Sequence, residues 1–371
     1  MSAKDANPPR GLSRRTVLGA ATTTALALPT IVPSQAWSQQ NQINVLAFTG
    51  YQEPGMLQPF EQATGIRVNL RIHSGSNEEI IAIIRAARPG EWDVVTPTSA
   101  FIPSLAREGL ARELNPGDYP LEDYFDLIRN WPLTTVNGKL YGIINRFGYY
   151  GIIYNERRFS AADVQSYDIL FDERARRRLA MFDWYLPNMG VLSKYRGNRT
   201  TPYDLPPERM ADLSQTLTRM RPSTGLVAPL AQVIQAMAAQ SFDLSIGGEF
   251  IQAGLARDGL PYKALVPREG GITWDQAPCI VHNTTRYENA RRFMQYITGP
   301  QFQARLAVAN AYFSMVPNRR AAALLTREQR ELLNLTDLDR FNEQFLANLS
   351  PRVEPENKND WMRMWEQFKS A

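Results

Sequence analysis

The 371-residue sequence is poor in the residues that build disulfides and metal sites. It has one cysteine, Cys279, and two histidines, His73 and His282, which lie far apart in the chain. A single cysteine excludes an intramolecular disulfide, and the spacing of these three residues fits no zinc site. We therefore expect no metal and no other cofactor, and a core that is stabilised by apolar packing alone.

The short motifs that mark common catalytic centres are also missing. There is no Gly-x-Ser-x-Gly elbow, no Gly-x-x-x-x-Gly-Lys phosphate loop and no His-Glu-x-x-His pair. The run from His73 to Ser76 offers a nucleophile without a base or an orienting group, and capping of a following helix by Ser76 or Asn77 explains it better. We therefore predict that the protein is not an enzyme.

The apolar run near the N-terminus is too short to cross a bilayer. It extends to Leu28 after the paired Arg14 and Arg15, and a small-residue segment ending at Ala36 follows. The run has roughly a dozen residues, against the about 20 that span a membrane. We predict a twin-arginine signal peptide over residues 1–38 and export to the periplasm, with a retained membrane helix or a disordered basic tail as alternatives.

Most of the basic excess lies in this predicted leader. The residues before Ala36 contribute +3 to the formal net charge of +4, so the mature chain is near +1. This removes the argument for nucleic-acid binding that a pI of about 9.1 would otherwise invite. Arginines between Arg174 and Arg178 share a predicted helix, residues 163–180, with acidic side chains, and we expect a solvated face there.

The start of the mature chain has the pattern of a β-α-β unit. Residues 43–46 form an apolar run that is too short for a helix, and Pro54-Gly55 breaks the chain before an amphipathic segment that ends at Gly65. The alternating residues 66–70 follow as a second strand. This order predicts a right-handed parallel pair of strands in an open α/β sheet.

Aromatic and hydroxyl residues follow the predicted strands of this unit. The first strand runs into Phe48, Thr49 and Tyr51, and a short strand at residues 92–95 leads to Ser99 and Phe101. Open sheets bind ligands beyond the carboxyl ends of their strands, so these side chains point to the site.

The rest of the chain continues to alternate between strands and helices. Asn137-Gly138 predicts a hairpin, and residues 147–154 predict a buried strand. Further strands are expected at residues 181–185, 242–246 and 262–266. The length favours two domains.

Several of these segments resemble the periplasmic solute-binding proteins of ABC importers, in particular the spermidine- and putrescine-binding group of extracellular solute-binding family 1. The resemblance spans nearly the whole mature chain and is carried, in order, by Tyr51, Glu53–Gly55, Phe60–Ile66, Trp92–Pro97, Glu108–Leu110 and Pro267–Trp274. It implies the type II periplasmic-binding-protein fold, in which crossover strands join two α/β lobes with a ligand cleft between them. The lobes would be residues 41–145 plus 276–320 and residues 146–275 plus 321–371.

The resemblance also implies the residues of the site. The family places aromatic residues where this chain has Phe48, Tyr51, Phe101 and Trp274, and a cation can stack on such rings. The expected roles are stacking walls for these four aromatic residues, ammonium acceptors for Asp183, Glu249 and Asp275, and polar orientation for Thr49, Ser99 and Gln276.

The sequence departs from the family at this site. The family's second-lobe tryptophan falls on Gly248, and its aspartate falls on Gln276, with Asp275 displaced by one. The second carboxylate of the family's acidic pair falls near Leu186 or Pro187. A polyamine needs paired carboxylates because an unpaired buried charge is costly. Because Gly248 leaves one wall open and the site has fewer carboxylates, a monoamine, an ω-amino acid or a bulkier amine is an alternative ligand. If the ligand carries a carboxylate, Arg146 or Arg268 could bind it.

We therefore predict the substrate-binding subunit of an ABC transporter, which captures a small amine or polyamine in the cleft and delivers it to an inner-membrane permease. We expect a monomer that binds no nucleic acid. A ligand sensor with the same fold is the alternative, because fold alone does not settle function.

Overall fold

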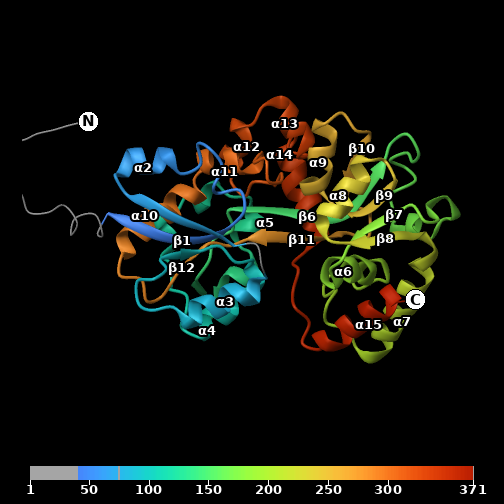
Figure 1. Ribbon diagram of the computed structural model, residues 1–371, viewed down its shortest axis with the longest axis horizontal. Coiled ribbons are helices and arrows are strands. Elements are labelled where there is room, and N and C mark those ends of the chain that lie inside the picture. Colours follow the sequence, from blue (N-terminus) through green and yellow to red (C-terminus); the bar gives the residue numbers. More distant parts are fainter. Residues whose placement is uncertain (1–40, 74–75, 371) are drawn as a thin grey trace, which may run out of the picture.

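The chain folds around two main β-sheets. The computed structural model describes residues 41–73 and 76–370. The predicted signal peptide over residues 1–38 lies outside these ranges. The sheets belong to two α/β lobes that lie side by side, with β6 (Arg146–Asn155) and β11 (Gly271–Gln276) passing between them (Figure 1). The two-lobed α/β architecture predicted from the sequence is confirmed.

The first lobe contains the predicted β-α-β unit. Strands β1 (Gln42–Phe48) and β2 (Arg67–His73) pair in parallel along their whole length, and α2 (Gln58–Thr64) connects them. Gly65 ends α2 with a φ of 68°, a left-handed conformation that glycine adopts without steric cost. The sheet has the order β12-β3-β1-β2, and its other strands are β3 (Val94–Val95) and β12 (Cys279–Ile280).

Turns and caps of this lobe follow the sequence signals closely. Ser76 caps α3 (Asn77–Ala86) by accepting a hydrogen bond from the backbone N–H of Glu79, as predicted. Asn137 and Gly138 both have positive φ and join the short strands β4 (Thr135–Val136) and β5 (Lys139–Leu140). The remaining α-helices of the lobe include α4 (Ile102–Arg107), α10 (Tyr287–Thr298) and α11 (Pro300–Ala307).

Strand β6 is the centre of the second sheet, and all of its residues are buried. It pairs antiparallel with β11, β9 (Leu244–Gly247) and β10 (Tyr262–Leu265). Beyond β9 lie β7 (Leu179–Phe182) and β8 (Thr224–Ala228), which form a parallel pair. The main helices of this lobe are α6 (Tyr185–Tyr195), α7 (Pro207–Met220), α8 (Leu230–Ala238), α9 (Glu249–Arg257) and α15 (Lys358–Ser370).

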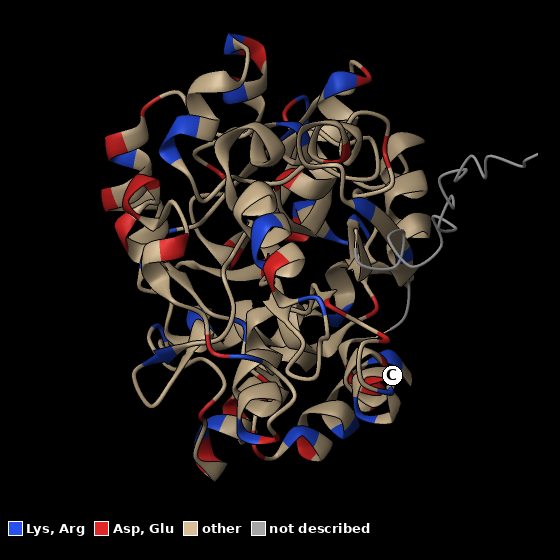
Figure 2. Ribbon diagram, turned by 90° about the vertical axis from the view of Figure 1, so that its left-hand side faces the viewer, with Lys and Arg blue, Asp and Glu red and all other residues tan. Residues whose placement is uncertain are grey.

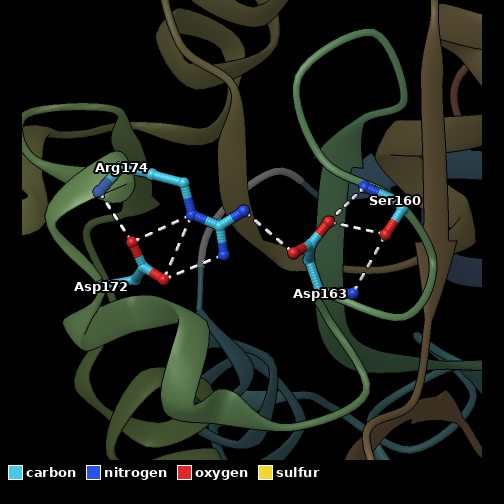
Figure 3. A network of polar contacts seen from close by, with 4 residues as sticks. All are labelled: Ser160, Asp163, Asp172 and Arg174. Carbon is cyan, nitrogen blue, oxygen red and sulfur yellow. Dashed lines mark hydrogen bonds and ion pairs between the residues drawn. The ribbon is translucent and has the colours of Figure 1, made fainter.

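The prediction of one helix over residues 163–180 is wrong. Two short 3-10 turns, Tyr167–Phe171 and Glu173–Ala175, occupy this segment. Asp163 accepts from the backbone N–H of Ser160, and Asp172 accepts from that of Arg174, so both carboxylates compete with helical hydrogen bonding. The Arg174 guanidinium joins the two carboxylates (Figure 3), and the hydrogen bonds from Ser160 and Arg174 lower the pKa of Asp163 to about 2.

The charged residues form a mixed and solvated surface. Arg174, Arg176 and Arg177 are exposed, as the charge pattern predicted. Basic and acidic residues are interspersed over the end of the molecule formed by the first lobe (Figure 2). That view shows no face of one sign, which argues against a nucleic-acid surface there. None of the helices between residues 41 and 370 that the structure describes has the length and apolarity to cross a membrane.

The buried apolar residues fall into two clusters, one in each lobe. Apolar residues between Ala321 and Leu346 belong to the first cluster, whereas Trp361, Trp365 and Phe368 of α15 belong to the second. The C-terminal segment therefore passes from one lobe to the other. The exact lobe boundaries given above stay predictions.

A buried ion pair in the first lobe joins the residue before β3 to the residue before α10. Asp93 is fully buried, lies 2.9 Å from Arg286, and accepts a hydrogen bond from the backbone N–H of Asn44 at 2.7 Å. We predict that Asp93→Ala lowers the free energy of unfolding by about 3–5 kcal/mol, because it leaves a poorly solvated guanidinium and an unpaired N–H. Denaturant unfolding measures this. Glu113→Ala, which removes an exposed pair with Lys139, is the control and should have little effect.

Candidate ligand-binding cleft

A cavity of about 980 Å³ lies between the two lobes. The first lobe lines it with Phe48 at the end of β1 and with residues around Glu78 and Phe101. The second lobe lines it with residues 182–186, from the end of β7 to the start of α6, and with Phe250 of α9. Both β1 and β7 are parallel strands that end at the cavity, so it lies where ligands of open α/β sheets bind.

Three of the four predicted aromatic walls line the cavity, namely Phe48, Phe101 and Trp274. Tyr51 does not, because it is fully buried in the first lobe, where it packs against Phe302 and receives a hydrogen bond from Asn145. Its place near the end of β1 was predicted correctly, but its ring points into the core.

Further aromatic side chains surround Trp274, and the sequence analysis did not find them. The Trp274 ring meets Phe250 edge-on at 5.8 Å and Tyr312 at 5.5 Å between centroids. Phe250 in turn meets Tyr150 at 5.3 Å. These residues come from four separate segments, so no local pattern in the sequence links them.

The expectation that Gly248 leaves one wall open is wrong. A Cβ atom at Gly248 would lie 2.1 Å from the carbonyl oxygen of Tyr149, so the close approach of α9 to β6 excludes a side chain. Phe250, two residues further on, lines the cavity instead. The second lobe therefore keeps an aromatic wall.

Asp183 lines the cavity, but both of its carboxylate oxygens already have donors. The indole N–H of Trp365 donates to one oxygen at 2.8 Å, and the ammonium of Lys369 donates to the other at 3.1 Å. Both donors come from α15. A carboxylate can accept about four hydrogen bonds, so a ligand ammonium at Asp183 would share it with Lys369.

Asp275 also lines the cavity, and it is held by the first lobe. Its two oxygens accept from the backbone N–H of Ser99 at 2.6 Å and from the Ser99 hydroxyl at 2.7 Å. Burial raises the pKa of this carboxyl, and the two bonds from Ser99 oppose that rise. Ser99 itself lies outside the cavity lining, so it positions Asp275 from behind.

Gln276 lines the cavity and connects to the buried Arg146 on its far side. Arg146 donates to the Gln276 side-chain oxygen at 3.0 Å and to the backbone carbonyl of Thr49 at 2.7 Å. Gln276 donates to the hydroxyl of Tyr312 at 3.1 Å. Arg146 thus directs its Nε and one terminal nitrogen to protein groups, while its Nη1 is buried and has no partner among the described residues. Thr49 does not line the cavity and contributes its backbone.

Glu249 is fully buried beside the cavity and does not line it. One oxygen accepts from the backbone N–H of Tyr149 at 3.2 Å, and the other lies against Gly148 next to the Trp274 indole. Burial raises the pKa of Glu249 well above its ordinary value, and the Tyr149 N–H opposes this. The acid thus supports the back of Trp274.

The C-terminal segment supplies the wall that the sequence analysis missed. Spacing of Trp361, Trp365 and Phe368 on one face signals a helix, but nothing local indicates that its other face borders the cleft. The residues of the C-terminal segment that line the cavity are Arg352, Glu354, Lys358, Asn359, Met362, Trp365, Glu366 and Lys369.

Arg268, a candidate partner for a ligand carboxylate, is 67% exposed and pairs with Asp168 outside the cavity.

Comparison with known families identifies the fold and its general role. The model of the bacterial extracellular solute-binding protein family matches residues 55–329, more than half of the chain. This chain belongs to that family. Its members are transport proteins and not enzymes, in agreement with the missing catalytic motifs. Among residues 41–73 and 76–370, no group of three or more acidic, histidine or cysteine side chains could hold a metal ion.

Individual relatives of this family member are distant in sequence and similar in structure. The spermidine/putrescine-binding periplasmic protein of Salmonella typhimurium is 24% identical over 293 residues, 76% of this chain and 79% of the relative. The putrescine/agmatine-binding protein of Pseudomonas aeruginosa is 24% identical over 321 residues, 80% and 83% of the two chains. The spermidine/putrescine substrate-binding protein of Streptococcus pneumoniae superposes with a TM-score of 0.76 at 18% identity, covering 89% and 99%.

The buried carboxyl of Glu249 should make the stability of the folded protein depend on pH. Its folded-state pKa lies above the ordinary value of 4.5, so the folded protein holds this proton more tightly and loses stability as the pH rises above 4.5. Each tenfold difference in proton affinity corresponds to about 1.4 kcal/mol. We predict that Glu249→Gln stabilises the protein at pH 7.5 but not at pH 4.5.

Thermal unfolding of both proteins across this pH range measures the difference. A stability gap between wild type and Glu249→Gln that does not widen with pH would contradict the assignment. As a control, Glu156→Gln makes the same substitution at a side chain that is 49% exposed.

Proposed function

We propose that this family member is the substrate-binding subunit of an ABC importer and that it captures a small amine or polyamine in the interlobe cleft. The main observation that supports this proposal is the cavity between the lobes, which is lined by aromatic rings from both sides. An ammonium group over such a face gains about 0.5–2 kcal/mol, and more where water is excluded. The amine ligands named for the Salmonella and Pseudomonas relatives support the same ligand class.

Capture would work by closure of the lobes around the ligand. Phe48 and Phe101 approach from the first lobe, whereas Trp184 and Phe250 approach from the second. A ligand that touches both sets stabilises the closed arrangement relative to the open one. Met362, which lines the cavity and is 46% exposed, is an apolar side chain that closure would cover.

Within this proposal the predicted residues divide into direct and supporting roles. Phe48, Phe101 and Trp274 would stack on the ligand, and Asp183, Asp275 and Gln276 would make polar contacts, since all six line the cavity. The other predicted residues do not line the cavity and would hold the lining residues in position; they are Thr49, Tyr51, Ser99 and Glu249.

The cellular setting follows from the same proposal. We propose export by the twin-arginine route, with the signal peptide over residues 1–38, and action in the periplasm as a monomer. An inner-membrane permease would receive the ligand from the closed form. The periplasmic location named for the Salmonella protein supports this setting.

A thermal-shift screen of the mature protein tests the ligand class. Spermidine, putrescine, monoamines, ω-amino acids, sugars and phosphate would be compared at equal concentration. A ligand at 100 times its dissociation constant should stabilise the folded state by about 2.7 kcal/mol, which raises the midpoint visibly. Stabilisation by amine-containing compounds is expected. Silence across all of these amines, or a response to sugars or phosphate alone, would overturn the proposal.

The aromatic walls give a second prediction. We expect Phe101→Ala to weaken binding of the amine found in the screen about 3- to 30-fold, since it removes one stacking face. Leu127→Ala, a truncation at a 43% exposed site outside the cavity, should leave affinity unchanged. Isothermal titration calorimetry measures both. Equal affinities of wild type and Phe101→Ala would remove this ring from the site.

A further inference from the structure

The charged side chains of the cavity lining are mostly matched with one another. Lys369 pairs with Asp183 and Glu366, and Lys358 pairs with Glu354 at 2.8 Å. Asp275 has both oxygens bonded to Ser99. A polyamine with two ammonium groups would therefore find few free carboxylates in this lining.

Arg352 is the lining cation that has no carboxylate partner among the described residues. It is 93% buried, with 7% of its surface exposed, and it forms no ion pair. Its guanidinium lies 4.3 Å from the ring centroid of Trp184, on the second-lobe wall of the cavity. Its charge opposes the rise that burial causes in the pKa of Asp275, and its charge and a side-chain hydrogen bond do the same for Tyr150.

An arginine in this position fits an anion. A buried cation without a counter-charge is costly, and the planar guanidinium matches a carboxylate with two parallel hydrogen bonds. The charge of Asp275 compensates Arg352 in part, but the two form no ion pair, and both Asp275 oxygens accept from Ser99. The aromatic contact with Trp184 holds the guanidinium in place without using its donors.

The opposite wall offers a complementary charge. Glu78 lines the cavity from the start of α3 in the first lobe, is exposed, and forms no ion pair among the described residues. Among the described lining residues, Arg352 on the second lobe and Glu78 on the first thus form no ion pair, although Glu78 also acts on Lys358 through its charge. A ligand with both charges would bridge the lobes.

We infer that the ligand of this cleft carries a carboxylate as well as an amine, with Arg352 binding the carboxylate and Glu78 the ammonium. The inference rests on the proposed function, the capture of an amine in the cleft, and narrows the ligand to an amino-acid-like zwitterion. Arg352 then determines specificity: it attracts a ligand carboxylate and repels a second ammonium group. Neither of the arginines considered from the sequence, Arg146 and Arg268, has this position.

The test compares three four-carbon probes that differ in one end group: γ-aminobutyrate, putrescine and n-butylamine. Calorimetry with the wild-type protein should show γ-aminobutyrate binding most tightly. Arg352→Gln should weaken γ-aminobutyrate roughly 10- to 100-fold, as expected for a charge-assisted hydrogen bond, and leave n-butylamine within about twofold. Glu78→Gln should weaken γ-aminobutyrate and n-butylamine alike.

Arg268→Gln is the matched control, because it removes an exposed arginine of the same lobe outside the cavity. Unliganded thermal midpoints show whether each variant folds. The inference of a zwitterionic ligand would be wrong if putrescine bound tightly, γ-aminobutyrate did not bind, and Arg352→Gln left putrescine affinity unchanged or raised it. Capture of an amine in the cleft would then still stand. Both proposals would be wrong if the wild-type protein bound none of the three probes and no amine in the thermal-shift screen raised its unfolding midpoint.

Discussion

The antiparallel pairing of β11 with β6 is the constraint on which the cleft depends. It sets Trp274 opposite Gly148 and Gln276 opposite Arg146. A Cβ atom at Gly148 would lie 1.6 Å from a Glu249 oxygen and 2.3 Å from the Trp274 indole nitrogen, so only glycine fits there. This pairing places Trp274, Asp275 and Gln276 of β11 in the cavity lining, where they are joined by Tyr150 of β6.

The C-terminal helix joins stability and recognition in one element. One face of α15 buries Trp361, Trp365 and Phe368 in the second-lobe core, and other side chains reach the cavity. Trp365 belongs to both sets, because it is 3% exposed and donates to Asp183. The acidic residue expected to meet a ligand ammonium is therefore bound first by its own chain.

Local signals in the sequence were sufficient for much of the fold. The β-α-β unit ending at Gly65 and the hairpin at Asn137-Gly138 depend on turn chemistry and short-range periodicity, which the sequence displays directly. The helix expected over residues 163–180 failed because Asp163 and Asp172 bond to the nearby backbone instead. Charged residues favour both arrangements, so composition could not separate them.

The cleft was predicted only where its residues follow a strand. Phe48 and Phe101 come after strands of the first sheet, so their approach to the sheet edge was predictable. Arg352 and Tyr312 reach the cavity through tertiary packing. The family match ends at residue 329, before Arg352 and all of α15. One wall of the cleft therefore lies outside the segment that identifies the family, whereas Phe101, Asp183 and Trp274 lie within it.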